Sequence, residues 1–362
     1  MNPTPRPLGR PVRTGHHTRD GRRAADHGGP ELHPRPDSPH DPQNADAAGA
    51  PRRGGRRLAT LTAAVALVSC APPGDDAKSM LAATPPTDAG PAARDDDPVP
   101  ATPSTVPRVG GVPDLAWFPD ADSTGVPEGT VLTPSEPLKI TEDGTVIDGL
   151  DVRGQITIRA DDVVVRNTRV ETNGDLYGIS LDPDYENLLI EDVDIVRTDS
   201  RCSVGIVHGN FTARRVDVSG CEDGLRVGDD TVVLDSYIHD LRESEGAHND
   251  VAQSLGGTNI TFIGNRMEGL HREQTSAVLF HSHFFPLDSV RLENNLFSGG
   301  TYTVAIKPKG DNPRPTDVVV RNNVWVRDSY KFGSHRFDAD GLVVEGNLFE
   351  DGTAYEYDTL KE

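Results

Sequence analysis

Several polar residues in the last third of the chain have the types and spacing needed for acid–base chemistry. His248 and Asp250 are two residues apart in the stretch Gly246–Gln253. On a β-strand, residues two apart project to the same side, and the residue between them projects to the other. We therefore expect His248 and Asp250 to point outward and Val251 to point to the core. A histidine in such a position can act as a general base, and a neighbouring aspartate can orient it.

Cationic residues lie in the neighbouring repeats, and we expect them to share the face of His248. Arginine or lysine can neutralise the carboxylate of an acidic sugar and stabilise negative charge that develops during a reaction. The predicted catalytic residues are His248, Asp250, Lys307 and Arg226. The predicted substrate-binding residues are His281, His283, Lys309, Arg272 and Gln253. In the competing interpretation, His248 and Asp250 form a structural hydrogen bond in a turn, and the lysines are merely solvated.

Two other constellations are weaker candidates. Asp229 and Asp230 are paired carboxylates, which can serve glycoside hydrolysis or Ca²⁺ binding. Adjacent strand residues face opposite ways, so a turn is the favoured interpretation of this pair. His281 and His283 have a spacing that suits metal ligation together with His248, although no fixed motif supports it. The sequence identifies no metal and no cofactor, and Ca²⁺ stays open as one.

A repeated eight-residue pattern must position these residues. Its copies begin at Val163, Leu188, Phe211, Thr231, Ile260, Val290, Val318 and Leu342. The starts are 25, 23, 20, 29, 30, 28 and 24 residues apart. Positions one and three are nearly always apolar, and position eight always is. Alternation with a period of two predicts a strand in each copy, and the repeat length predicts a solenoid. The longer intervals after 231, 260 and 290 hold extra loop residues, which in solenoids gather on a binding face.

A second strand follows most copies, which favours a parallel β-helix over a leucine-rich repeat, since the latter needs a leucine scaffold and a helix in each unit. We expect these strands at Gly178, Gly205, Gly224, Asp250, Ala277 and Val304. Stacking them in this alignment puts Arg226 near Ala252 and His281 near Ser254. It also puts Lys307 two coils above Gln253.

Together these patterns predict an all-β fold, a right-handed parallel β-helix of about nine coils. Asparagine stands at position six of the last four copies, and we interpret it as a structural hydrogen-bonding ladder. The four residues are Asn265, Asn295, Asn323 and Asn347. The first coil needs a cap because an open end exposes a strand edge, and residues 113–140 are the candidate.

Composition divides the chain into four parts. Residues 1–57 carry 11 arginines against 6 acidic residues without apolar periodicity, which indicates disorder. Residues 58–70 are a signal segment, and residues 71–112 are a linker rich in proline, alanine and aspartate. Residues 113–362 form the β-helix domain, with 22 Lys and Arg against 45 Asp and Glu, a net charge of −23. So acidic a body disfavours nucleic-acid binding. We expect a monomer.

The signal segment resembles that of bacterial lipoproteins. Four arginines precede an apolar run that is too short to span a bilayer, and the run ends in Leu67-Val68-Ser69-Cys70. The resemblance implies cleavage before Cys70, a lipid on that cysteine, and an exported domain anchored to the cell membrane and facing outward. An ordinary secretory signal or an uncleaved anchor is the alternative. The 57 residues before the run are long for such a signal, so we expect translation to begin further downstream.

The two remaining cysteines are predicted to form a disulfide. Cys202 lies three residues before Gly205, and Cys221 lies three before Gly224. Those glycines take the same place in consecutive coils. The cysteines should therefore lie on adjacent coils within bonding range, in an oxidising compartment.

The repeats, the asparagine positions and the segments GVPDLAWFPDADSTGVPEGTVL and GTVIDGLDVRG resemble the pectate-lyase-like superfamily of right-handed parallel β-helices. The resemblance covers residues 113–355. It implies action on an acidic polysaccharide by a lyase or a hydrolase, and the HNDVAQ stretch resembles secreted bacterial members without a defined reaction. We find neither the polygalacturonase motif nor the calcium-site pattern of pectate lyases. We favour β-elimination slightly, with glycoside hydrolysis or a non-catalytic, wall-associated glycan-binding solenoid as alternatives.

Overall fold

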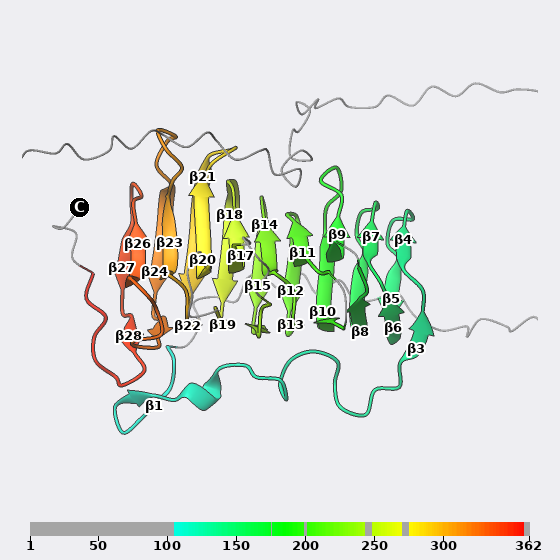
Figure 1. Ribbon diagram of the computed structural model, residues 1–362, viewed down its shortest axis with the longest axis horizontal. Coiled ribbons are helices and arrows are strands. Elements are labelled where there is room, and N and C mark those ends of the chain that lie inside the picture. The colour runs from blue at the N-terminus through cyan, green and yellow to red at the C-terminus, as the bar shows by residue number, and fades with distance from the viewer. Residues whose placement is uncertain (1–104, 175, 199–200, 243–247, 270–274, 358–362) are drawn as a thin grey trace, which may run out of the picture. The chain divides into compact units, whose positions relative to one another are not determined.

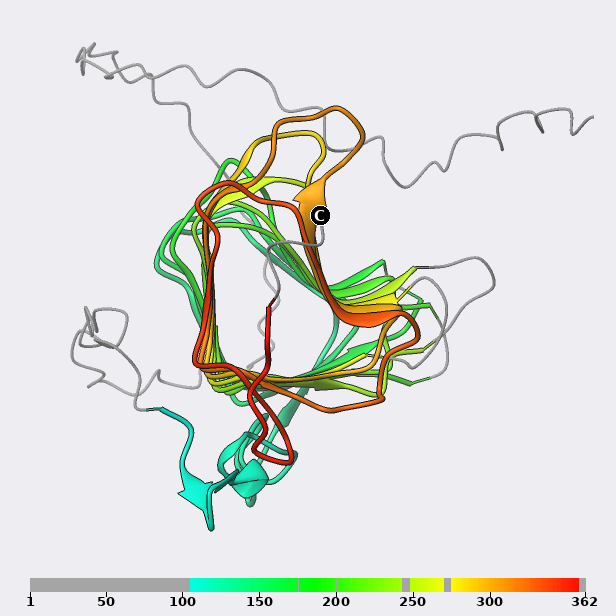
Figure 2. The ribbon, with the colours of Figure 1, turned by 90° about the vertical axis from the view of Figure 1, so that its left-hand side faces the viewer.

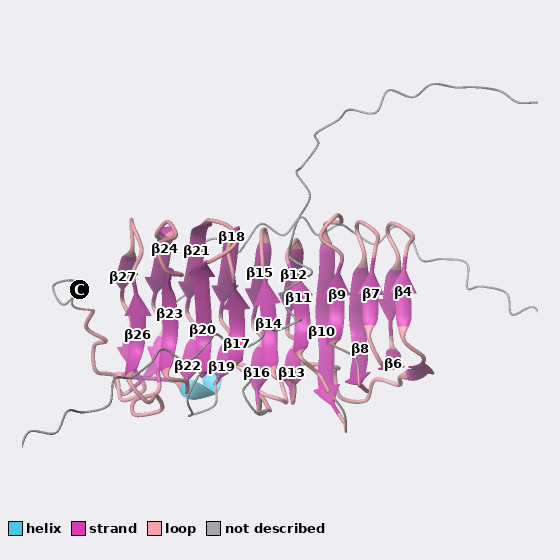
Figure 3. Ribbon diagram, turned by 45° about the horizontal axis from the view of Figure 1, so that its top comes forward, coloured by secondary structure: helices cyan, strands magenta, loops and turns pink. Residues whose placement is uncertain are grey.

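The computed structural model describes residues 105–357, apart from residue 175 and segments 199–200, 243–247 and 270–274. Almost all of this part is strand and turn, and its one helix is the short η2 (Leu115–Trp117) (Figure 3). The strands stack as successive coils of a parallel β-helix (Figure 1). The predicted all-β solenoid is confirmed. No helix among the described residues is long and apolar enough to cross a membrane.

One sheet contributes a single strand from every coil, and its nine strands confirm the predicted number of coils. Neighbours in this nine-stranded sheet are parallel, and the order follows the chain. Its strands are β4 (Leu138–Ile140), β7 (Ile156–Ile158), β9 (Tyr177–Leu181), β11 (Val204–His208), β14 (Asp223–Val227), β17 (Asn249–Ser254), β20 (Thr275–Ser282), β23 (Tyr302–Pro308) and β26 (Gly333–Phe337).

Two further parallel stacks complete each coil, and from residue 163 onward both come from the eight-residue repeat. One stack holds β5 (Val146–Asp148), β8 (Val164–Thr172), β10 (Leu188–Arg197), β12 (Phe211–Arg214), β15 (Thr231–Leu234), β18 (Gly257–Ile263), β21 (Leu287–Glu293), β24 (Thr316–Arg321) and β27 (Val343–Glu345). The other holds β3 (Thr133–Ser135), β6 (Leu150–Arg153), β13 (Asp217–Ser219), β16 (Tyr237–His239), β19 (Arg266–Glu268), β22 (Leu296–Ser298), β25 (Val324–Trp325) and β28 (Leu348–Phe349). β8 and β10 are long enough to belong to both.

The core is the column of inward side chains between these sheets. The apolar residues at position eight are fully buried in seven of the eight copies, and the last is partly buried near the end of the solenoid. The seven are Val170, Ile195, Val218, Ile238, Met267, Phe297 and Trp325. Because identical positions stack coil upon coil, a short repeat buries a continuous apolar core.

The asparagine ladder is confirmed. The side-chain Nδ2 of Asn265 donates to Oδ1 of Asn295 at 2.9 Å, and Asn295 donates to Asn323 at 3.0 Å. Asn323 in turn donates to Asn347 at 3.1 Å. Each Nδ2 also donates to a backbone carbonyl, such as that of Val233 for Asn265. These buried amides therefore satisfy one another from coil to coil.

Residues 105–132 do not cap the first coil, and the expected cap at 113–140 is wrong for most of its length. This segment, which we call the strap, runs along the outside of the coils (Figure 1, cyan). It contains the antiparallel pair β1 (Arg108–Val109) and β2 (Val112–Pro113). In it, Phe118 packs in one cluster with Leu296 and Val324 of late coils. Leu296 and Val324 point outward beside inward aromatic residues, and Phe118 covers them.

Further along, the strap crosses the middle coils before it enters β3. The Gly125 N–H donates to the carbonyl oxygen of Arg215 at 2.8 Å. The Val126 N–H donates to Oδ1 of Asp194 at 3.2 Å. The first coil itself begins only with β3 and β4.

Cys202 and Cys221 are joined by a disulfide, with their Cα atoms 4.7 Å apart. They precede β11 and β14, so the bond links adjacent coils beside the nine-stranded sheet. Cys70 lies outside the described residues.

Candidate functional site

The outward side chains of the nine-stranded sheet, which we call the outer face, fall into rows because the strands are in register. The first row is Tyr177, Val204, Asp223, Asp250, Ser276 and Tyr302. The second row is Ser180, Val207, Arg226, Gln253, Leu279, Ala305 and Arg336. The third row contains His281 and Lys307. The residues next to the first row, such as Val251 and Ala277, point into the core and are fully buried.

Asp223 and Asp250, the acid pair, lie on neighbouring coils in the first row. Their exposed fractions are 3% and 1%, although both project from the outward side of the sheet. Nη2 of Arg226 donates to Oδ2 of Asp223 at 2.8 Å, and the Asp250 N–H donates to Oδ1 of Asp223 at 3.0 Å. Asp250 accepts fewer hydrogen bonds than Asp223, and none of them comes from an arginine. Its Oδ2 accepts from Nε2 of Gln253 at 3.0 Å, and the carboxyl group also faces the backbone N–H of Ser276, although no donor among the described residues lies within hydrogen-bond distance of its buried Oδ1.

These surroundings give the two carboxyl groups different pKa values. Burial, and after it the nearby charge of Asp223, raises the pKa of Asp250 well above the ordinary value of an aspartate. Burial also raises the pKa of Asp223, but the guanidinium of Arg226 opposes this shift. The pair therefore favours a proton on Asp250 and a negative charge on Asp223. Two carboxyl groups held in different protonation states are a common arrangement for acid–base catalysis.

A group of basic side chains, the cation cluster, lies on the next coils toward the C-terminus. Its members are His281, His283, Lys307, Lys309 and Arg336. Burial lowers the pKa of His281 to about 4, and the positive charges of Lys307 and Lys309 contribute. His281 is therefore neutral at neutral pH. Its Nε2 is buried without a partner in the part of the chain that the structure describes.

Burial and the charges of Arg336 and Lys309 also lower the pKa of Lys307. An anion would relieve this mutual repulsion among the cations. The cluster is thus suited to a carboxylate or another anionic group of a ligand, in a domain that is otherwise strongly acidic.

Two loops flank this end of the outer face. They follow β20 and β23 and project from the coils (Figure 2, yellow and orange), while the strap lies on the opposite side. His283 stacks on Phe284 in the first loop, with ring centroids 4.1 Å apart. The Lys309 N–H donates to the carbonyl oxygen of Ser282 at 3.3 Å, which joins the second loop to the first.

The structure brings together most of the residues that the sequence singled out. Arg226, Asp250 and Gln253 are part of the acid pair and its hydrogen bonds. His281, His283, Lys307 and Lys309 belong to the cation cluster. His248 is exposed and precedes β17 instead of lying within it. Arg272 lies outside the described residues.

The register of the second strands is shifted by one residue from the expected alignment. Arg226 pairs with Gln253 instead of Ala252. Lys307 lies beside His281, and neither is in the row of Gln253. The residue that matches Gly224 is Val251, not Asp250. A one-residue slip turns a side chain to the opposite face, so it changes which groups meet.

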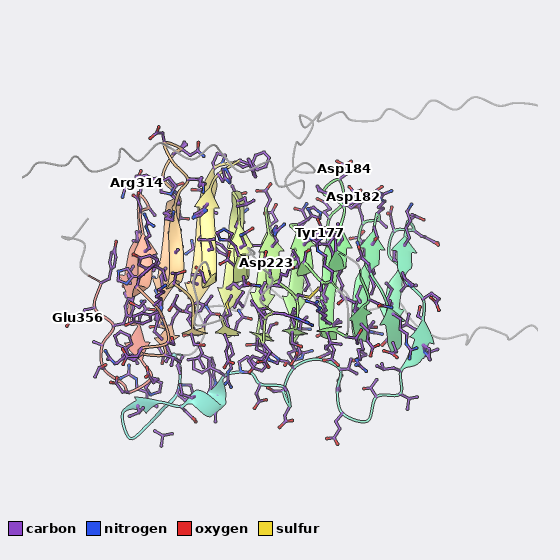
Figure 4. The ribbon with its side chains drawn as sticks, viewed as in Figure 1. Tyr177, Asp182, Asp184, Asp223, Arg314 and Glu356 are labelled. Atoms are coloured by element: carbon purple, nitrogen blue, oxygen red, sulfur yellow. A yellow bond between two sulfur atoms is a disulfide. The ribbon has the colours of Figure 1, made fainter. Side chains whose placement is uncertain are left out.

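Asp223 is the functional candidate that sequence reasoning missed. The signal was a repeated spacing: Asp223 and Arg226 are three residues apart, as are Asp250 and Gln253. In each coil the residue at the later position donates a hydrogen bond to the aspartate. With the correct register these two units stack directly (Figure 4 labels Asp223).

The weaker candidates, the Asp229–Asp230 pair and the predicted histidine metal site, show no catalytic or metal-binding geometry among the described residues. Asp230 has a positive φ of 49°, and Oδ1 of Asp229 accepts from the Thr258 N–H at 2.9 Å. This pair forms a turn between coils, as the favoured interpretation had it. Among the described residues, no three His, Cys, Asp or Glu side chains are grouped so that they could hold a metal ion.

Comparisons with known proteins add little to this description. No family model matches the chain. No curated protein matches it either. Among solved structures, an alginate lyase from Paenibacillus sp. str. FPU-7 is similar, with a TM-score of 0.33 and 12% sequence identity. The match covers 59% of this chain and 97% of that one. A likeness this weak does not indicate a function, so the functional argument rests on the residues of the outer face.

Proposed function

We propose that this protein binds an acidic polysaccharide along its outer face and hydrolyses a glycosidic bond. The observation that carries the proposal is the acid pair: two buried carboxyl groups on neighbouring coils, of which Arg226 pairs with one alone. Glycoside hydrolysis needs two carboxyl groups of this kind, one protonated and one ionised. The outer face supplies Asp250 for the first role and Asp223 for the second.

The spacing of the coils favours a double displacement. Adjacent strands are about 4.8 Å apart, close to the separation of about 5–5.5 Å between the carboxyl groups of retaining glycosidases. In the first step, the Asp223 carboxylate attacks the anomeric carbon while Asp250 gives its proton to the leaving oxygen. In the second step, the Asp250 carboxylate takes a proton from water, and the water oxygen displaces Asp223 from the sugar.

The cation cluster accounts for the acidic character of the proposed substrate. Lys307 and Arg336 offer positive charge beside a neutral His281, and a uronate carboxylate has the matching charge and hydrogen-bonding capacity. Lys309 and His283 would contact the same sugar from the flanking loops. Arg272 stays a proposed substrate-binding residue. We assign no chemical step to His248, which is exposed at the edge of the face.

β-Elimination is the second candidate, and His281 favours it. This reaction needs a base for the proton next to the sugar carboxylate, and cations that stabilise the resulting charge. A neutral His281 lies beside Lys307, and its Nε2 has no hydrogen-bond partner among the described residues, so it meets both needs. We prefer hydrolysis because elimination leaves the paired environments of Asp223 and Asp250 without a role. A solenoid that only binds glycans is the third alternative.

A panel of uronate-containing polysaccharides separates these alternatives. New reducing ends without the absorbance of unsaturated uronates would support hydrolysis. Reducing ends and absorbance that rise together would show elimination instead. Retention of a polysaccharide without either product would show binding alone. If every acidic polysaccharide is neither retained nor cleaved, the proposal is wrong.

We further propose that the protein is exported and held at the outer side of the cell membrane by a lipid on Cys70, and that it acts as a monomer. The lipoprotein-like segment that supports this proposal lies outside the described residues. Replacing Cys70 with Ser should remove the protein from the detergent phase of a phase-partitioning assay. Unchanged partitioning would contradict the lipid anchor.

A further inference from the structure

Two tyrosines occupy the first row of the outer face at equal distances from the acid pair. Tyr177 is on β9, two coils before Asp223, and Tyr302 is on β23, two coils after Asp250. At about 4.8 Å for each coil, each ring is displaced by about 10 Å along the coil axis. Figure 4 shows Tyr177 displaced from Asp223 in this way.

Both tyrosines point away from the core. Gly178 follows Tyr177, and a Cβ on Gly178 would meet Ile195 inside the solenoid. Thr303 follows Tyr302 and is fully buried. Because Tyr177 and Tyr302 occupy the same register position as Asp223 and Asp250, the two tyrosine rings lie on the same side as the acid pair.

A second ring accompanies each tyrosine. Tyr177 meets His208 edge to face, with centroids 6.4 Å apart, and Tyr302 meets Phe332 at 5.9 Å. Phe332 is 64% exposed, and the guanidinium of Arg336 lies 5.8 Å from the centre of the Tyr302 ring. Rings fixed by a neighbour offer apolar contact area at little entropic cost, and the phenol adds a polar group.

We propose that Tyr177 and Tyr302 hold sugar rings on both sides of the acid pair, so that the glycan continues past the reacting bond in both directions and is cut internally. This inference rests on the proposed function. The coils between carry the small or neutral residues Val204 and Ser276, which leave the row continuous from one tyrosine to the other. The cation cluster lies on the Tyr302 side, so the acidic sugar binds there.

Five substitutions and a control test the proposal. Tyr177→Ala and Tyr302→Ala should each raise KM for a long oligosaccharide by about 3- to 10-fold, and shift the cleavage position. Tyr177→Phe and Tyr302→Phe keep the ring and lose only the phenol, so each should raise KM less than the matching alanine variant does. Trp117→Ala removes a 39% exposed aromatic side chain from the strap, away from the outer face, and should change nothing. Because Phe332 is largely exposed, Phe332→Ala should fold normally, and it should raise KM less than Tyr302→Ala does.

Viscosity measured beside reducing ends gives the mode of cleavage. Internal cutting lowers the viscosity of a polymer long before reducing ends accumulate, and the proposal expects this. Release of only short products from one chain end would overturn it. The proposal would also be overturned if the alanine variants had the activity of the unsubstituted protein while Asp250→Asn was inactive. In both of these cases the proposed hydrolysis would stand. A protein that neither cleaves nor retains any acidic polysaccharide would overturn both proposals.

Discussion

Replacing Asp250 with asparagine separates the catalytic role of this residue from its structural one. The amide has nearly the shape of the carboxylic acid, and its oxygen can still accept the hydrogen bond from Gln253. It cannot give a proton to a leaving oxygen. We therefore expect Asp250→Asn to fold normally and to lose about 10²–10⁴ in turnover, which corresponds to about 3–5 kcal/mol at 1.36 kcal/mol for each factor of ten.

The same variant should change how stability depends on pH. The pKa of Asp250 is raised in the folded protein, so the folded state keeps a proton that the unfolded chain releases above its own pKa of about 3.9. Across that window the stability of the unsubstituted protein falls as pH rises, by up to about 1.4 kcal/mol per pH unit for one proton. Asp250→Asn lacks this loss, and at neutral pH it should be at least as stable as the unsubstituted protein.

Urea unfolding at several pH values, together with turnover per folded molecule, measures both effects. Asp194→Asn is a matched control, because burial also raises the pKa of Asp194, to about 6, but its carboxylate accepts from the strap and not from the outer face. The control should show a similar change in pH dependence between about 3.9 and 6, with normal turnover. Normal turnover in Asp250→Asn, or an unchanged pH dependence, would refute the reasoning about the acid pair.

Three further predictions concern the scaffold. Asn295→Leu removes the middle of the buried ladder and should lower the free energy of unfolding by about 2–4 kcal/mol; an unchanged urea midpoint would argue against the ladder. Replacing both Cys202 and Cys221 with serine should cost about 3 kcal/mol, and two free thiols in the non-reduced protein would contradict the bond. Phe118→Ala should release the strap, seen as faster amide exchange in residues 105–126 with little change in the nine-stranded sheet. Equal exchange in both proteins would show that Phe118 does not fix the strap.

The coil architecture was predictable because the repeat carries its own physical signature. Apolar residues at position eight, from Val170 to Trp325, must face a core that is continuous from coil to coil. The inward asparagines were predictable for the same reason. A buried amide needs a hydrogen-bond partner, and an amide that recurs at the same position in each coil finds one in the next coil.

The candidate site was harder to predict, because it depends on register. In the earlier coils a glycine marks the residue that turns inward, as Gly224 does. The next coil has Val251 at that place, and the run Val251-Ala252 offers two apolar residues to align. If Asp250 is aligned with Gly224, it is displaced by one residue from Asp223, and the stacking of the two aspartates is missed. The strap escaped prediction for a different reason: nothing in its own sequence shows that Phe118 would find Leu296 and Val324, which are far away in the chain.

The central claim is that the outer face holds a protonated Asp250 next to an ionised Asp223, and a titration of the side-chain carboxyl carbons by NMR tests it most directly. The Asp250 resonance can be assigned by its absence in Asp250→Asn. The account predicts that Asp250 keeps its proton at a pH where exposed aspartates, with pKa values of about 3.9, are already ionised. It also predicts that Asp223 loses its proton first. An Asp250 that ionises together with the exposed aspartates would contradict the account.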